Sequence, residues 1–362
     1  MNKQAFVQKH LLRRSWLSYL LLPLSLPYTL YMLLRRKMAA MFPEYRAPVC
    51  IISVGNLIAG GSGKTPFTIY LAKLLAGKGI RVAVSHRGYG SVNERMTQIV
   101  SDRTGLLAAC NTAGDEVQLL AEELRGIPVV SGKHRKAAIR LLLKQFPDLD
   151  CIILDDSFQH LQVRHDVDII VVNAHMGFGN GFVLPAGYLR EPVPALKYAD
   201  ILIINNSQQQ MIEKDSLAKG LSAYHKPLLA GHYQVEGCTD FQGQPVTAEQ
   251  LRGIPILLVS AIGNPAGFAR TAHQLGLEIA GQVQFPDHYP YVDKTALNQL
   301  LSTMRSSGAQ RIVTTAKDYV KLQNHPELAS VLVTLHISFV LDKEQEFLTR
   351  QIMAVIDKKR AL

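Results

Sequence analysis

The hydrophobic positions of the chain fall mainly into short, continuous apolar runs separated by longer amphipathic stretches. Runs of this kind lie near residues 49–54, 81–85, 127–131, 150–155, 167–172 and 200–204. Short runs with many β-branched residues are typical of strands that are buried on both faces of a parallel sheet. The stretches between them, such as residues 133–146, have helical spacing. The alternation predicts an α/β domain, a parallel α/β/α sandwich, over residues 47–227.

The pattern changes after residue 227. Residues 228–250 alternate polar and apolar positions among several turn-forming residues, which predicts a linker of short strands. Apolar runs near residues 254–260 and 311–315 follow. Residues 251–362 are therefore expected to form a second, smaller α/β domain. In open parallel sheets, ligands bind at the carboxyl ends of the strands, so functional residues are expected there.

Residues 1–46 form a segment of another kind. Residues 15–34 are 20 positions without a charge, which is just long enough to cross a bilayer. Pro23 and Pro27 interrupt this run, and basic residues flank both ends, so the charge pattern gives no orientation. We expect a membrane-associated helix that lies in or dips into one leaflet. A buried core helix is the alternative, whereas a signal peptide is disfavoured because basic residues stand where a cleavage site belongs.

The charge distribution supports this interpretation. The formal net charge is +10, and residues 1–46 hold eight basic residues and one acidic residue, so +7 of the total lies there. A nucleic-acid partner is disfavoured, and contact of this segment with the anionic cytoplasmic leaflet is favoured. The four cysteines have no metal or redox spacing, which favours a reducing, cytosolic environment. They are Cys50, Cys110, Cys151 and Cys238.

A glycine-rich loop joins the first apolar run to a helical stretch. The order of strand, loop and helix is that of a P-loop, in which backbone N–H groups surround phosphate oxygens. Lys64 is expected to reach the β and γ phosphates, and Thr65 to offer its hydroxyl to Mg²⁺. One position departs from the strict pattern, because Ile58 stands where the first glycine is usual. The residues expected to bind ATP are Ala59, Gly60, Gly61, Ser62, Gly63, Lys64 and Thr65.

Two carboxylates, Asp155 and Asp156, end the apolar run at residues 150–155. In P-loop enzymes, the aspartate at the end of a neighbouring strand holds the metal ion or its waters, whereas the alternative role is capping of a turn. A guanine-specific enzyme also needs an Asn-Lys-x-Asp sequence after a later strand. The two nearest candidates, Asn205-Asn206-Ser207-Gln208 and Thr315-Ala316-Lys317-Asp318, lack this pattern. ATP is therefore the expected nucleotide.

Further motifs occur in a fixed order along the chain. They are Ser85-His86-Arg87-Gly88-Tyr89-Gly90, Gly114-Asp115-Glu116, Leu154-Asp155-Asp156-Ser157-Phe158-Gln159-His160, Gly179-Asn180-Gly181, Leu184-Pro185-Ala186-Gly187-Tyr188-Leu189-Arg190-Glu191, Ile262-Gly263-Asn264-Pro265 and Phe285-Pro286-Asp287-His288. Together they resemble the tetraacyldisaccharide 4′-kinases of lipid A synthesis, over about residues 10–325. The departures are Ser157 and Tyr188 in place of Gly and Pro, Val117 in place of Pro, and the additional His86.

The resemblance implies transfer of the γ-phosphate of ATP, with Mg²⁺, to the 4′-hydroxyl of a tetraacylated glucosamine disaccharide 1-phosphate. The product would be the 1,4′-bisphosphate, lipid IVA, formed at the cytoplasmic face of the bacterial inner membrane. No obligate protein partner is inferred. The residues by themselves indicate only phosphoryl transfer near a membrane. Two alternatives therefore stay open: a membrane-associated P-loop ATPase without a lipid acceptor, and a non-catalytic scaffold.

The resemblance also implies roles for single residues. Asp115 and His288 match the positions of the family's base dyad, although helix capping is an alternative for Asp115 and a plain surface histidine for His288. Because these two residues fall in different expected domains, we expect domain closure over ATP to complete the site. The expected metal ligands are Thr65, Asp155, Asp156 and Glu191. The expected substrate contacts are Arg87, Glu116, Gln159, His160 and Arg190.

Overall fold

The computed structural model of the chain divides into two compact units. It describes residues 14–39, 41, 44–89, 91, 96–107, 112–205, 211–292 and 294–361, with side chains left out at 211–215. The first unit comprises Met1–Tyr233 and Phe339–Leu362, and the second comprises Gln234–Ser338. The chain passes between the units within two strands, β8 (Leu228–Asp240) and β13 (Leu332–Leu341). Of the residues considered above, Gly90, Cys110, Asn206, Ser207 and Gln208 and the basic residues before position 14 lie outside the described residues.

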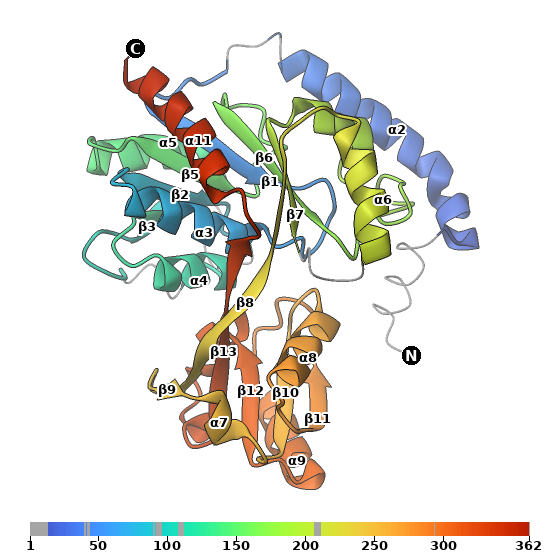
Figure 1. Cartoon of the computed structure of the whole chain (residues 1–362), viewed down its shortest axis with the longest axis vertical. Helices are drawn as coiled ribbons and strands as arrows, with labels where there is room; N and C mark the ends of the chain where they lie inside the picture. The colour runs from blue at the N-terminus through green and yellow to red at the C-terminus, as the bar shows by residue number, and fades with distance from the viewer. Residues whose placement is uncertain are drawn as a thin grey trace. The chain divides into compact units, whose positions relative to one another are not determined.

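The first unit is a mostly parallel sheet with the strand order β8-β7-β6-β1-β5-β2-β4-β3, in which only β3 is antiparallel to its neighbour (Figure 1). Its strands other than β8 are β1 (Cys50–Gly55), β2 (Val82–His86), β3 (Gln98–Ser101), β4 (Val129–Ser131), β5 (Cys151–Asp155), β6 (Val167–Asn173) and β7 (Ile201–Asn205). Its helices are α2 (Trp16–Ala39), α3 (Lys64–Gly77), α4 (Asp115–Glu123), α5 (Arg135–Gln145), η2 (Val193–Tyr198), α6 (Met211–Ser222) and α11 (Gln345–Arg360).

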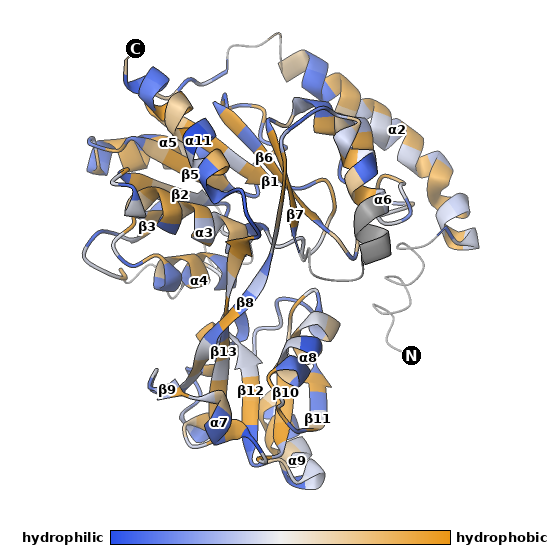
Figure 2. Cartoon of the chain, in the orientation of Figure 1, coloured by the Kyte–Doolittle hydropathy of each residue, from blue (hydrophilic) through white to orange (hydrophobic). Residues whose placement is uncertain are grey.

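Alternate residues of the central strand β1 pack against two helical layers. Cys50, Ile52 and Val54 join a buried cluster with apolar residues of α3, α4 and α11. Ile51, on the opposite face, joins a second cluster with α5. Because both faces are covered, the strands are apolar at nearly every position, as Figure 2 shows for β1, β6 and β7. The predicted α/β/α sandwich is confirmed.

The C-terminal helix α11 belongs to the first unit, which differs from the expected division at residue 251. Leu348, Ile352 and Ile356 recur at four-residue intervals and are fully buried in the cluster around β1 and α3. The helix is also held by ion pairs from Lys359 to Asp166 and from Arg360 to Asp150. The last 24 residues therefore complete the core of the first unit rather than the second.

Helix α2 docks on the first unit through a narrow stripe of buried residues. Its buried residues, Ser18, Ser25 and Met32, are seven positions apart and so lie on one side of the helix. The Ser25 hydroxyl donates to the carbonyl oxygen of Val183 at 2.8 Å and accepts from the backbone N–H of Ala186 at 3.0 Å. Most of the large apolar side chains of α2 are exposed instead. The helix is long and apolar enough to cross a membrane, and it continues through both of its prolines.

The second unit is a smaller α/β layer structure with the strand order β11-β10-β12-β13, all parallel. Apolar residues of β10 alternate between a cluster with α9 and α10 and a cluster with α7 and α8. The expected second α/β domain is thus present. Its elements other than β8 and β13 are β9 (Pro245–Val246), α7 (Ala248–Leu251), β10 (Ile256–Ser260), α8 (Pro265–Gln274), β11 (Ile279–Gln284), α9 (Lys294–Ser307), β12 (Arg311–Thr315), α10 (Ala316–Leu322) and η3 (Pro326–Leu328).

Candidate active site

The glycine-rich loop leaves β1 and enters α3 at Lys64. Gly63, directly before the helix, has φ +87°, a left-handed conformation that favours glycine. A Cβ atom there would also lie 2.0 Å from Nδ2 of Asn205 and 2.2 Å from the Tyr233 hydroxyl. Glycine at this position therefore allows the loop backbone to lie close to the neighbouring strands.

Asn205, at the end of β7, is hydrogen-bonded to the glycine-rich loop. Its Nδ2 group donates to the carbonyl oxygen of Ser62 at 3.1 Å and to the Tyr233 hydroxyl at 2.7 Å. Within the loop, Asn56 donates to the Ser62 hydroxyl at 2.7 Å. In the sequence, Asn205 stood out only as the first residue of a segment that does not match the guanine-recognition pattern. Its position instead assigns it to holding the conformation of the phosphate-binding loop.

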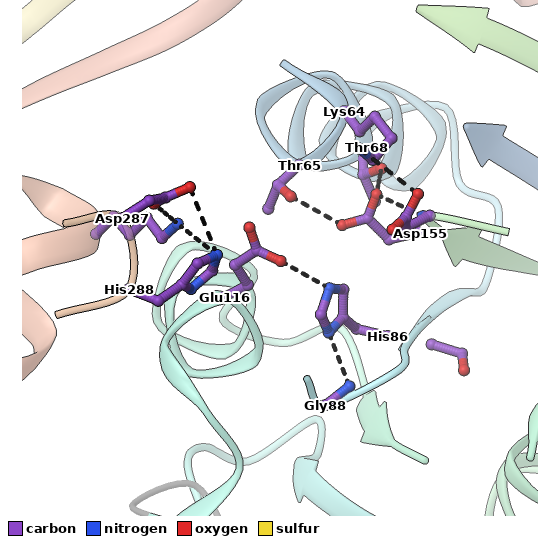
Figure 3. Close-up of polar contacts among 12 residues, drawn as sticks. Lys64, Thr65, Thr68, His86, Gly88, Glu116, Asp155, Asp287 and His288 are labelled. Carbon is purple, nitrogen blue, oxygen red and sulfur yellow. Dashed lines mark hydrogen bonds and ion pairs between the residues drawn. The ribbon is translucent and has the colours of Figure 1, made fainter. Parts of the chain in front are cut away.

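The register of two strands brings a buried carboxylate beside the start of α3. Val54 of β1 pairs with Asp155 of β5, so β5 ends level with the beginning of the loop. Figure 3 shows the hydroxyls of Thr65 and Thr68 directed at the Asp155 carboxylate, each at 3.0 Å. Burial raises the pKa of Asp155, which means that its anionic form requires hydrogen bonds or a nearby cation. A hydroxyl and a carboxylate are oxygen ligands that fit Mg²⁺.

Asp156 is held by cations. Lys64 Nζ lies 3.5 Å from Asp156 Oδ1, and Arg190 Nη1 donates to both carboxylate oxygens, at 2.8 and 3.0 Å. Burial opposes ionisation of Asp156, but the charges of Lys64 and Arg190 outweigh it, so the pKa of Asp156 lies below its usual range. Lys64 and Arg190 are thus both positioned at the carboxyl end of β5. They give this end of the strand a positively charged lining, which is a suitable environment for phosphate groups.

Asp115 is the first residue of α4, and it is buried. The N-cap of this helix is Gly114, which has φ +88°, so the capping role considered for Asp115 is not the one that the structure gives it. A Cβ atom at Gly114 would lie 2.9 Å from the carbonyl oxygen of Tyr89. The glycine therefore allows Asp115 to sit at the point where α4 approaches the loop after β2.

Glu116, the next residue, is paired with His86 at the end of β2 (Figure 3). The backbone N–H of Gly88 donates to Nδ1 of His86 at 3.0 Å, so Nδ1 acts as the acceptor. In the neutral ring, Nε2 consequently carries the proton and donates to Glu116 Oε2 at 3.1 Å. The additional histidine that departs from the family's usual sequence thus orients Glu116.

Two arginines, Arg87 and Arg135, lie near the segment that follows β5. Arg135 of α5 is buried, donates to the Ser85 hydroxyl and to the carbonyl oxygen of Asp155, and has a pKa lowered by burial to about 10. Burial, with the positive charges of Arg135 and Arg87, lowers the pKa of His160 to about 4. The Nε atoms of Arg87 and Arg135 are buried and have no hydrogen-bond partner among the described residues. Such unsatisfied donors fit an anionic ligand.

Helix α2 contributes to the same segment. Arg36 forms a bidentate ion pair with Glu191, with Nε at 2.6 Å and Nη2 at 3.2 Å from the carboxylate oxygens. Glu191, expected above as a metal ligand, is buried and engaged by this arginine in the structure. Arg35 donates to the carbonyl oxygen of Gln159 at 2.9 Å, and Gln159 donates to the carbonyl oxygen of Asn56 at 2.9 Å. The helix is therefore bonded to residues adjoining the P-loop.

His288 lies in the second unit, on the loop after β11, with φ +64°. Its backbone N–H donates to the carbonyl oxygen of Ala261 at 3.3 Å. Lys317 Nζ lies 3.1 Å from Asp287 Oδ1 and 3.4 Å from Nε2 of His288. His288 is therefore fixed by a structured loop, in contrast to a freely solvated surface histidine.

The described residues of the first unit bring together most of the expected site. Lys64, Thr65, Asp155, Asp156 and Arg190 are joined by direct contacts. No cluster of three or more His, Cys, Asp or Glu side chains with metal-binding geometry occurs among the described residues, so a metal ion here would rely on hydroxyl, phosphate and water oxygens as well. The sequence motifs did not identify Thr68, Asn205 and Arg135 as residues of the site. All three lie outside the recognised motifs, and Asn205 and Arg135 are also distant in sequence from Ser62 and Ser85, which they contact.

Comparisons with known proteins agree with this geometry. The sequence profile of the family described as tetraacyldisaccharide-1-P 4′-kinase matches residues 17–357. A tetraacyldisaccharide 4′-kinase of Syntrophus aciditrophicus is 35% identical over 348 residues, covering 92% of each chain. One of Anaeromyxobacter sp. is 35% identical over 321 residues, covering 88% of this chain and 85% of the relative.

A solved structure is also similar over most of the chain. LpxK from Aquifex aeolicus, determined in complex with ATP, superposes with a TM-score of 0.75 and 29% identity, covering 94% of this chain and 99% of the other. The profile match spans both units and the greater part of α2, so it does not rest on the P-loop alone. The chain belongs to the tetraacyldisaccharide-1-P 4′-kinase family.

Proposed function

We propose that this chain transfers the γ-phosphate of ATP to the 4′-hydroxyl of a tetraacylated glucosamine disaccharide 1-phosphate and so forms the 1,4′-bisphosphate. Membership of the family over residues 17–357 supports the acceptor. The observation that carries the chemistry is the contact of Thr65 with Asp155, beside Lys64, at the carboxyl end of the sheet. A P-loop ATPase without a lipid acceptor is disfavoured, because the family match extends far beyond the nucleotide site.

ATP binds with Mg²⁺ at the glycine-rich loop in this proposal. Residues Ala59 to Gly63 present backbone N–H groups to the phosphates, and Lys64 contacts the β and γ phosphates. Thr65 and Asp155 hold the metal ion, with Asp156 nearby. The bound ion supplies charge neutralisation for the transferring group. Arg87, Arg190 and the buried Arg135 neutralise the remaining phosphate charge.

Asp115 and His288 remove the proton from the attacking hydroxyl in this proposal. A carboxylate partner fixes the tautomer of an imidazole and raises the basicity of the pair, so a sugar hydroxyl can lose its proton near neutral pH. Support for Asp115 comes from its burial at the first residue of α4, a helix whose N-cap residue is Gly114. Support for His288 comes from its fixed position on the loop after β11.

The lipid acceptor requires that the enzyme work at a membrane surface. We place it at the cytoplasmic face of the bacterial inner membrane, where ATP is available, with α2 in the leaflet. Exposed apolar side chains on α2 support this placement. Glu116, Gln159 and His160 are proposed to contact the acceptor.

The test is transfer of label from γ-³²P-labelled ATP to the acylated disaccharide, followed by separation of the lipid products. Wild-type enzyme is expected to give a labelled bisphosphorylated glycolipid. Asp115→Ala and His288→Ala are expected to lose about 10²-fold or more in kcat with nucleotide binding intact. If the two residues act as one unit, the double variant loses little beyond either single variant. Absence of labelled lipid with active, ATP-binding protein would contradict the proposal.

A further inference from the structure

Residues Thr315 to Asp318 form the N-cap and the first turn of α10, and they do not match the guanine-recognition pattern. Thr315 is the N-cap of this helix, and its hydroxyl accepts from the backbone N–H of Asp318 at 3.2 Å. Asp318 is fully buried. This first turn of α10 faces the loop of residues 285–291, which carries His288. The function proposed above gives it no role.

Three side chains of α10 contact the loop, those of Lys317, Asp318 and Lys321. The Asp318 carboxylate accepts from the Tyr291 hydroxyl at 3.3 Å and from the backbone N–H of Ala261. Ala261 in turn accepts the backbone N–H of His288. Lys321 Nζ donates to the carbonyl oxygen of Tyr289 at 2.9 Å. These bonds hold a loop in which His288 and Tyr291 both have positive φ, at 64° and 55°, a conformation that side chains rarely adopt alone.

Lys317 of α10 reaches the imidazole of His288 itself. Its ammonium group lies 3.4 Å from Nε2 of His288. An ammonium group can only donate, so Nε2 acts as the acceptor. In the neutral ring, the proton is therefore on Nδ1, which leaves an N–H donor for a carboxylate partner.

The charge of Lys317 also acts on the protonation state of the ring. A positive charge next to an imidazole disfavours the imidazolium form, whereas the carboxylate of Asp287, 3.8 Å from Nε2, favours it. Lys317 pairs with Asp287 at 3.1 Å and so weakens that carboxylate's effect. The charged and titratable groups around this loop in the second unit also include Asp318, Lys321, Tyr289, Tyr291 and His325.

We propose that Lys317 is a positioning residue for the phosphoryl transfer: it holds His288 as a neutral imidazole with its proton on Nδ1. This inference rests on the proposed role of His288 in proton removal. With Nε2 engaged by Lys317 and the Nδ1 proton donated to the carboxylate of the dyad, the hydroxyl proton passes to that carboxylate. A protonated ring would weaken the basicity of the carboxylate, so the dyad operates only when the ring is neutral. Lys317 extends the pH range of activity toward acid by preserving that form.

Steady-state kinetics with the acylated disaccharide test the inference. Lys317→Gln is expected to move the acid limb of the kcat/KM profile upward by about one pH unit, because the ring then protonates more readily. The KM for ATP should not change. Lys317→Arg keeps the charge and should restore the acid limb to within a few tenths of a unit. Lys321→Gln removes a loop contact without touching the ring, and its acid limb should match that of wild type.

An unchanged acid limb in Lys317→Gln, or an equal shift in Lys321→Gln, would overturn the inference. Nuclear magnetic resonance of ¹⁵N-histidine-labelled protein provides a second measurement that needs no activity, with His288→Ala identifying the signal. The neutral His288 ring should carry its proton on Nδ1 in wild type, and it should titrate at higher pH in the Lys317→Gln variant. A neutral ring with its proton on Nε2 in wild type would refute the assignment. Full turnover by His288→Ala would instead refute the proposed role of His288, whatever the resonance data show.

Discussion

Asp155 is a fully buried carboxylate whose ionised form depends on the hydrogen bonds that it receives. Thr68 supplies one of them from inside α3, one turn after Thr65, the proposed metal ligand. Thr68→Val keeps the side-chain shape and removes the donor. We expect a loss of about 1–3 kcal/mol in the free energy of unfolding, because a buried acceptor loses a partner. Urea unfolding of Thr68→Val and the control Thr68→Ser measures it; equal stability of the Thr68→Val variant and the wild type would contradict the assignment.

His160 provides a pH-dependent test of the same region. Its pKa is about 4 in the folded chain and 6.5 in the reference state. Between these values, only the unfolded chain binds the proton, so this contribution to stability is complete above pH 6.5 and is lost as the pH falls toward 4. His160→Gln should therefore show a smaller loss of stability over this interval than wild type. Thermal unfolding against pH checks this, with the exposed His175→Gln as control; identical slopes in all three proteins would contradict it.

The sequence predicts the local part of the site well, because Lys64, Thr65 and the glycines follow one another along the chain. Their backbone conformation is set by neighbouring residues. Asn205 and Arg135 could not be identified in that way. Strand pairing brings Asn205 to Ser62 of the loop from 143 residues away in sequence, and helix packing brings Arg135 to Ser85 from 50 residues away. His86 was noticed as a departure from a motif, but its pairing with Glu116 follows only from the structure.

At the scale of elements, the apolar runs predicted six strands of the first unit. The missed strand, β3, has four residues and is an antiparallel edge strand, so it carries little hydrophobic signal. The segment expected as a linker of short strands contains the 13-residue strand β8 and the two-residue strand β9. Alternation of polar and apolar residues is typical of a half-exposed strand, and Gly237, at φ 150°, fits within it without a break.

A buried ion pair between Arg36 and Glu191 contributes to the docking of α2. Arg36→Met would leave the Glu191 carboxylate buried without its partner, which is expected to cost about 3–5 kcal/mol. The guanidinium also packs over the rings of Phe158 and Tyr198. Chemical unfolding in detergent should therefore show a clear destabilisation. Lys37→Met removes an adjacent exposed charge and serves as the control; equal effects of the two substitutions would exclude a specific role for the pair.

At the scale of the whole molecule, α2 presents an apolar surface that the first unit leaves uncovered. Trp16, the single tryptophan, is 66% exposed at the start of this helix and can report on it. Its fluorescence should shift to shorter wavelength with vesicles that contain anionic lipid, and the shift should weaken with salt, because basic residues flank the apolar run. A variant with Leu24→Asn and Leu30→Asn should bind less; the same emission with and without vesicles would contradict the placement.

The division of the chain into two units was only partly foreseeable. Each unit has its own hydrophobic core, with clusters on both faces of its strands, and the apolar runs in the sequence predicted both units. The return of the chain to the first unit through β13 and α11 was not apparent, because an amphipathic helix does not reveal in sequence which sheet it covers. The expectation that the units close around ATP stays a prediction.

The central claim is that ATP cleavage is coupled to phosphorylation of a lipid. The most direct measurement compares the ADP released with the bisphosphorylated glycolipid formed in the same reaction, with Lys64→Ala as the inactive control. We predict one ADP for each lipid phosphorylated, and very little ADP when the acylated disaccharide is left out. Steady ADP release that is independent of the disaccharide, with no change in the mass of the lipid, would contradict the account.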